Sequence, residues 1–121
     1  MKTSIKATNI ELTSSIRSYV EDKLSHLDNM VEKYNDSSAQ VEVGKITRHH
    51  KSGEVFFAEI NLHMDGKLFR EVVDAEDLYA AIDQAKDKMH LDIGAYIKKN
   101  NRLLRRGGQM IKRFLRRPDT E

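Results

Sequence analysis

Residues 54–73, EVFFAEINLHMDGKLFREVV, decide the fold of this chain. Apolar side chains fall at every second position of residues 56–64, and Glu59, Asn61 and His63 alternate with them, which predicts a strand with one buried face. Asp65-Gly66 favours a type I′ hairpin turn, because both central positions of that turn need positive φ. Residues 67–73 then form the partner strand.

The two-residue turn sets the register of this hairpin. It pairs Leu62 with Phe69 and Ile60 with Glu71, so the carboxylate of Glu71 falls on the core face. An inward charge is one way to protect an edge strand from pairing with another chain. We therefore expect residues 67–73 at the edge of the sheet; an error of register is the alternative.

Upstream of the hairpin, the sequence predicts a strand, a helix and a second strand. Residues 3–8 and 39–47 alternate apolar and polar side chains, which favours strands. Between them, Thr13 is a suitable N-cap, and apolar residues follow it at intervals of three and four. This stripe consists of Ile16, Val20, Leu24, Leu27, Val31 and Tyr34. Residues 48–53, RHHKSG, form a polar loop.

Downstream of the hairpin, the sequence predicts a second helix. Asp74 is its expected N-cap, with Asp77 three residues later as in a capping box. Its apolar stripe consists of Leu78, Ile82, Ala85, Met89, Ile93 and Tyr96. Gly107-Gly108 is expected to end the helix, and residues 109–117 form a short amphipathic segment after it.

The predicted order is β-α-β-β-β-α, an α+β fold. The first two strands are parallel across a right-handed crossover, and the last three form an antiparallel meander. Each helix has one apolar stripe, so both helices pack on one face of a four-stranded mixed sheet. We expect one domain over residues 1–101 and a basic extension over residues 102–121, whose order the sequence leaves open.

Charge is unevenly distributed along the chain. Residues 98–117 hold nine of the 21 Lys and Arg and none of the 19 Asp and Glu, so the remainder has a net charge of −7. An acidic body with a basic end indicates that this end meets a polyanion, either a nucleic acid or an anionic membrane surface.

Catalysis has little support in the sequence. The absence of cysteine removes disulfides, thiolate zinc sites and cysteine nucleophiles. His49-His50 lacks a third ligand at a defined spacing, and the glycines match no phosphate-binding loop. We expect no catalytic residue, metal, cofactor or small-molecule substrate. No apolar run could span a bilayer and no secretory signal is visible, so a cytoplasmic protein without a membrane partner is expected.

Basic residues on the outward sides of the two helices are the candidate RNA-binding residues, because structured RNA is bound largely through its phosphates. They are Arg17 and Lys23 on the first helix, Lys86 and Lys88 on the second, and Lys98, Lys99, Arg102, Arg105 and Arg106 toward its end. Any one of them alone would be read as a solvated surface residue. The prediction rests on their clustering.

Three stretches of the sequence resemble the ribosome hibernation-promoting factors, also called ribosome-associated inhibitors or ribosomal subunit interface proteins. They are IKATNIELTSSIRSYVEDKLSHL, HHKSGEVFFAEINLHMDGK and DAEDLYAAIDQAKDKM. The resemblance implies a fold like a double-stranded RNA-binding domain with an added strand. It also implies a non-enzymatic inhibitor of translation that occupies the mRNA and tRNA channel of the small ribosomal subunit under stress or in stationary phase. Arg17, Lys23 and Lys88 match basic positions of the family, and a short-type member that is monomeric when free is expected.

The sequence departs from this resemblance in the second helix. Leu91, Asp92 and Ala95 stand where basic or polar residues are expected. Either the RNA contact has shifted to later residues, or the chain is a divergent RNA-binding module with a different target. An interfacial role for residues 109–117 ranks lower because nine residues give little attachment to a membrane. A nuclease that uses the aspartates of the second helix ranks last.

Overall fold

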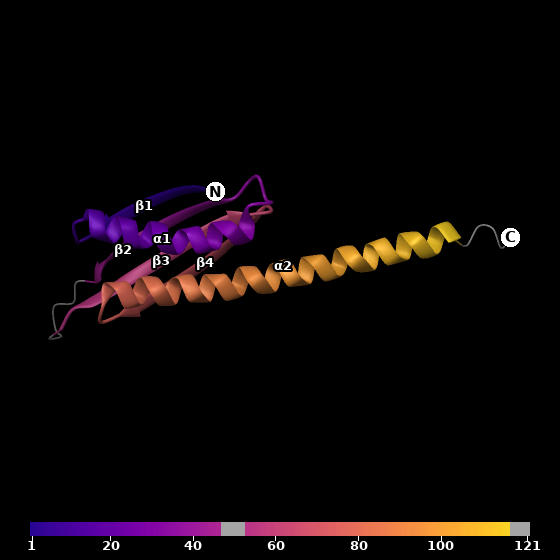
Figure 1. Cartoon of the computed structure of the whole chain (residues 1–121). Helices are drawn as coiled ribbons and strands as arrows, with labels where there is room; N and C mark the ends of the chain where they lie inside the picture. The colour runs from indigo at the N-terminus through magenta and orange to yellow at the C-terminus, as the bar shows by residue number, and fades with distance from the viewer. Residues whose placement is uncertain (47–52, 117–121) are drawn as a thin grey trace.

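A computed structural model describes the backbone of residues 1–46 and 53–116 and the side chains through residue 108. The elements follow the predicted order (Figure 1). They are β1 (Lys2–Thr8), α1 (Ser14–Val31), β2 (Ser38–Ile46), β3 (Val55–Met64), β4 (Lys67–Ala75) and α2 (Leu78–Arg116). Most of the predicted polar loop, with His49-His50, and the last five residues of the chain lie outside the described residues.

The sheet has the strand order β1-β2-β3-β4, with β1 parallel to β2 and the other pairs antiparallel. The hairpin register is the predicted one, with Leu62 opposite Phe69 and Ile60 opposite Glu71. Asp65 and Gly66 both have positive φ, as the type I′ turn requires. The register was therefore correct, and Glu71 does point inward from an edge strand.

Both helices cover the same face of the sheet, as predicted (Figure 1). The side chain of Thr13 caps α1 by accepting a hydrogen bond of 3.2 Å from the backbone N–H of Ile16. The core lies between the helices and the sheet, where both apolar stripes meet the inward side chains of β2 and β3. Its largest fully buried side chains are Leu27, Leu62, Met64, Met89, Ile93, Val20, Val31 and Val43.

The start of α2 differs from the prediction. Asp74 was expected to cap the helix, but it still belongs to β4, where it pairs with Phe57. Asp77 is the cap instead, and its carboxylate accepts a hydrogen bond of 3.2 Å from the backbone N–H of Ala80. Both aspartates fit a capping pattern, and the pairing of β4 with β3 decides between them.

The end of α2 also differs from the prediction. Gly107-Gly108 does not end the helix, which continues to Arg116. Neither glycine has the positive φ that a C-cap glycine adopts, so both residues are ordinary helical positions. The predicted domain boundary at residues 101 and 102 falls inside this helix, near the place where α2 extends past the sheet (Figure 1).

A polar network ties the tip of the β3–β4 hairpin to both helices. The carboxylate of Asp36, which follows α1, accepts hydrogen bonds of 3.0 Å from the backbone N–H groups of Asp65 and Gly66. These bonds lower the pKa of Asp36. The hydroxyl of Tyr96 on α2 donates to the carboxylate of Asp65. α2 is thus anchored where it leaves the body of the protein.

Candidate nucleic-acid interface

The outward side of α2 beyond the sheet carries a ridge of basic side chains. We call the exposed residues Lys98, Lys99, Arg102, Arg105 and Arg106 the basic ridge. At 3.6 residues per turn they share one side of the helix, facing away from the stripe that contains Met89 and Ile93. None of them forms an ion pair with any described side chain. The basic ridge therefore has its charges available for a polyanion.

Lys88 lies on the same side of α2, closer to the start of the helix, and is exposed. Ten residues separate it from Lys98, which is about 15 Å along the helix axis. Between them lie Leu91, which is 71% exposed, and Ala95. The basic surface of α2 thus consists of one isolated lysine and the basic ridge, and the stretch between them contains no Lys or Arg.

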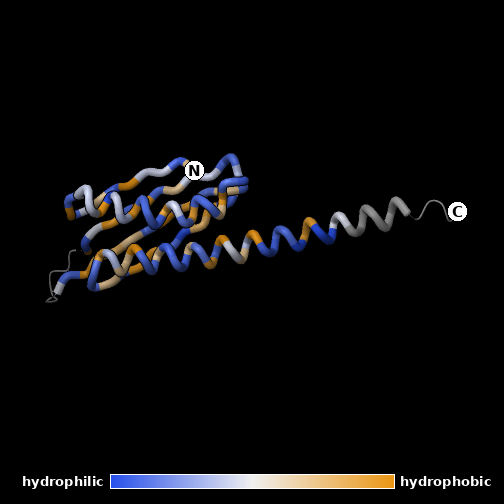
Figure 2. Tube along the Cα trace, viewed as in Figure 1, coloured by the Kyte–Doolittle hydropathy of each residue, from blue (hydrophilic) through white to orange (hydrophobic). Residues whose placement is uncertain are grey.

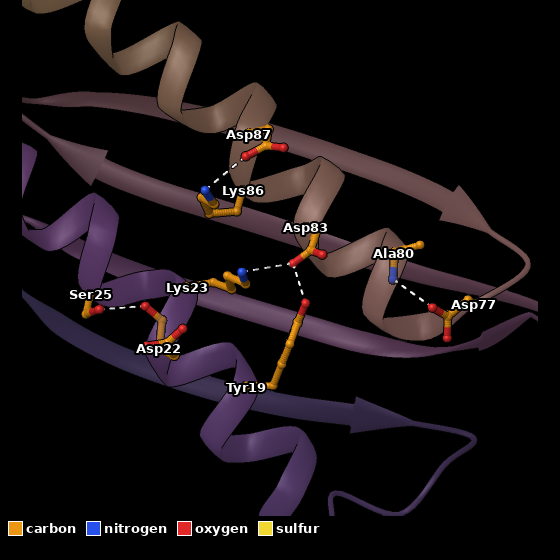
Figure 3. Close-up of polar contacts among 9 residues, drawn as sticks. All are labelled: Tyr19, Asp22, Lys23, Ser25, Asp77, Ala80, Asp83, Lys86 and Asp87. Carbon is orange, nitrogen blue, oxygen red and sulfur yellow. Dashed lines mark hydrogen bonds and ion pairs between the residues drawn. The ribbon is translucent and has the colours of Figure 1, made fainter.

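Lys23 does not extend freely from α1, because it is held against α2 (Figure 3). Its ammonium nitrogen lies 3.3 Å from a carboxylate oxygen of Asp83 and 5.0 Å from the centre of the Tyr19 ring. The Tyr19 hydroxyl donates a 2.6 Å hydrogen bond to the same carboxylate. That hydrogen bond, with burial and the charge of Asp83, raises the pKa of Tyr19 to about 12. This network joins the two helices and neutralises the charge of Lys23.

Lys86 is also paired. Its ammonium nitrogen lies 2.9 Å from a carboxylate oxygen of Asp87, and its side chain is only 16% exposed. The hydrogen bond from Lys86 lowers the pKa of Asp87. Arg17 is exposed on α1, outside the ion pairs formed among the described side chains. Of the predicted RNA-binding residues on the body, Arg17 and Lys88 therefore remain available, whereas Lys23 and Lys86 have carboxylate partners.

An acidic pair lies beside Lys88. Glu71 on the edge strand lies beside Asp92 on α2, and hydrogen bonding to the side chain of Asp92 raises the pKa of Glu71. Burial and the charge of Asp92 act in the same direction, while Lys88 opposes them. The sequence revealed the inward Glu71 but not its partner. The signal was present, since Asp92 follows Met89 by three residues and precedes Tyr96 by four, which places it on the side of α2 that faces the core.

The aspartates of α2 do not form one cluster. Asp83 contacts α1 and Asp87 pairs with Lys86, whereas Asp92 contacts β4. Within residues 1–46 and 53–108, His, Asp and Glu side chains do not gather in a group of three that could hold a metal ion. The arrangement offers binding through charge, and the nuclease alternative has no support from the placement of these carboxylates.

One known protein family matches most of the chain. The family described as "Sigma 54 modulation protein / S30EA ribosomal protein" matches residues 3–101. The match covers β1 to the middle of α2 and includes Lys98 and Lys99, while Arg102, Arg105 and Arg106 lie beyond it.

Curated relatives carry names that agree with the resemblance. A "Ribosome hibernation promotion factor" of Picosynechococcus sp. is 33% identical over 83% of this chain and 51% of its own length. The chain thus spans about half the length of that relative. A "Ribosome hibernation promoting factor" of Klebsiella oxytoca is 30% identical over 74% of this chain and 85% of its own length.

A solved structure agrees with these relatives. The crystal structure of the Thermus thermophilus Protein Y N-terminal domain superposes with a TM-score of 0.61 at 33% identity, covering 79% of this chain and 99% of that domain. The expected resemblance is therefore confirmed, and the chain belongs to the Sigma 54 modulation protein / S30EA ribosomal protein family.

Proposed function

We propose that this chain is a ribosome-binding hibernation factor that stops translation by occupying the mRNA and tRNA channel of the small ribosomal subunit. The names of its relatives support the association with ribosome hibernation. The basic ridge is the observation that supports this contact, because its five exposed cations lie on one side of a helix and have no counter-charge among the described side chains. The role is one of binding, without a catalytic step.

Ribosomal RNA is the partner that fits this surface best. Phosphates lie at regular intervals along RNA, and each contact with Lys or Arg releases condensed counterions, so the affinity grows with the number of cations in line. The five residues of the basic ridge supply such a line from a single element. Arg17 and Lys88 supply a second contact from the body of the protein.

A second candidate function is an RNA-binding module of the same fold with another docking site. The acidic pair Glu71–Asp92 favours it, since these carboxylates lie beside Lys88 and would repel a phosphate there. Leu91 and Ala95 add no positive charge to compensate.

Competition on the small subunit tests the proposal and separates the two candidates. We expect the chain to co-sediment with empty small subunits and to be displaced when mRNA and a P-site tRNA fill the channel. It should also inhibit protein synthesis in a purified translation system. Equal binding to empty and filled subunits would contradict channel occupancy and favour the second candidate.

A further inference from the structure

The apolar stripe of α2 does not end where the sheet ends. Tyr96 and Ile97 pack partly against the core. Leu103 lies seven residues, or two helical turns, after Tyr96, and Leu104 lies seven residues after Ile97. Leu103 is 53% exposed and Leu104 is 67% exposed. Figure 2 shows apolar positions continuing along the part of α2 that projects from the body. The side of α2 that faces the core therefore continues as an uncovered apolar surface.

The two sides of this projecting segment, residues 98–116, differ sharply in chemistry. The basic ridge occupies the side opposite Leu103 and Leu104, so charge and apolar surface are separated around the helix axis. The sequence repeats the pattern over residues 109–116, QMIKRFLR. No acidic residue occurs in the whole segment.

The possible occupants of the apolar side differ in what they supply. RNA supplies phosphates to the basic ridge but no apolar surface for Leu103 and Leu104. A second copy of the helix supplies apolar surface but brings another set of positive charges and no acidic residue. An anionic lipid bilayer supplies hydrocarbon and negative headgroups together, and as a fluid surface it needs no matching shape.

We propose that the projecting segment of α2 is an interfacial helix that binds an anionic lipid bilayer. Leu103 and Leu104 insert below the headgroups, and the flanking Lys and Arg contact lipid phosphates, which is the arrangement expected for a basic amphipathic helix. Nine residues after Gly107-Gly108 were too few for such an attachment. The unbroken helix changes this, because the amphipathic side chains begin before the glycines, at Lys98, and the helix continues to Arg116, about 28 Å farther along its axis.

The helix lies on the bilayer and does not cross it. Within the described residues, no helix combines the length and the apolar character that crossing a membrane requires. The acidic body, joined to the segment through Tyr96 and Ile97, remains on the aqueous side because anionic headgroups repel it. This inference does not rest on the proposed ribosome binding, but both partners would engage the basic ridge, so a chain bound to lipid through this segment does not present the ridge to RNA.

Vesicle flotation of the full chain tests the inference in the absence of ribosomes. We expect binding to vesicles of phosphatidylcholine mixed with phosphatidylglycerol and no measurable binding to phosphatidylcholine alone. Replacing Leu103→Gln and Leu104→Gln together keeps the net charge and should lower the partition coefficient roughly tenfold or more, because both side chains lose their burial in lipid. Leu91→Gln is the control, since Leu91 is 71% exposed on the other side of α2, and this substitution should leave binding unchanged.

Three results would overturn the inference. One is the absence of binding to the anionic vesicles. The second is binding that the double Gln variant leaves intact, because the apolar side would then have no part in it. The third is self-association of the wild-type chain in sedimentation equilibrium that the double variant abolishes, since a second copy would then be the occupant. Circular dichroism of each variant checks that the fold is retained, which the exposure of all three leucines predicts.

Discussion

The two halves of α2 share one periodicity but differ in their surroundings. In the first half, residues 78–97, the apolar stripe is buried on the sheet, and Met89 and Ile93 are fully buried. In the second half, residues 98–116, the same spacing continues at Leu103 and Leu104, which are exposed. The spacing of apolar residues therefore specifies a helix and its apolar side. The surface that covers this side comes from the rest of the fold or from a partner.

The two halves also differ in what stabilises them. Burial against the sheet stabilises the first half. The second half depends on helix propensity and on the turn before it, because extending an existing helix avoids the cost of nucleation. Stability changes should therefore be large in the first half and local in the second.

The largest contrast is expected between two apolar truncations on the same helix. Met89→Ala should lower the free energy of unfolding by about 2–5 kcal/mol, because the side chain is fully buried. Leu104→Ala should change it by less than about 0.5 kcal/mol, because the side chain is 67% exposed. Urea denaturation measures both. Equal losses would mean that the second half is covered in the free protein as well.

Substitution of a glycine in the first half should have the next largest effect on the free energy of unfolding. A methyl group added at Gly94 would meet only the terminal carbon of Met30, at 3.7 Å, which is an ordinary van der Waals distance. Gly94→Ala should therefore raise the free energy of unfolding by about 0.5–1 kcal/mol through helix propensity. A loss of stability in urea denaturation would show that α1 and α2 pack too tightly there to accept a methyl group.

The acidic pair at the edge of the first half predicts a smaller, pH-dependent effect. The folded state raises the pKa of Glu71, so the protonated side chain stabilises the protein at pH values below the pKa of Glu71 in the unfolded chain. This stabilisation is lost as the pH rises through the higher pKa of Glu71 in the folded protein. Glu71→Gln should therefore stabilise the protein near neutral pH, by on the order of 0.5 kcal/mol at this partly exposed site. The gain should disappear at acidic pH in thermal melts. A gain that does not change with pH would point to a cause other than the charge of Glu71.

The smallest effect on global stability is expected in the second half. A methyl group added at Gly107 or Gly108 meets no atom within 4 Å. Replacing both by Ala should increase the helical signal in far-ultraviolet circular dichroism, since each Gly costs a helix about 1 kcal/mol relative to Ala. The urea midpoint of the body should stay the same. A shifted midpoint would show that the two halves unfold as one unit.

Most of the fold could be predicted from the sequence, because local signals agree with one another. Alternation in β3 and the Asp65-Gly66 turn determined the register, and that register correctly placed Glu71 inward at the sheet edge. The two errors concern the ends of α2. Gly107-Gly108 resembles a helix stop, but glycine only permits the left-handed conformation and does not impose it.

For the candidate site, the sequence could predict where the basic residues cluster but not which of them form ion pairs. The basic ridge follows from spacing along one helix, and sequence alone describes that spacing. The ion pairs of Lys23 and Lys86 were missed. The pairing of Lys23 with Asp83 depends on how two helices lie on the sheet, and 60 positions of sequence separate the two residues. The RNA-binding role of the nine predicted residues stays a prediction.

A charge-matched comparison tests the central claim most directly. In one variant the five residues of the basic ridge become Gln; in the control, the exposed Lys2, Lys6, Lys33, Lys67 and Arg70, none of which lies on α2, become Gln. Both variants have the same net charge, and small-subunit binding is measured against salt concentration. We expect the ridge variant to bind more weakly, with a log–log salt slope shallower by roughly 0.7–0.9 for each phosphate that it no longer neutralises, and the control to keep the wild-type slope. Equally weakened binding in the two variants would contradict the account, because overall charge and not the basic ridge of α2 would then govern binding.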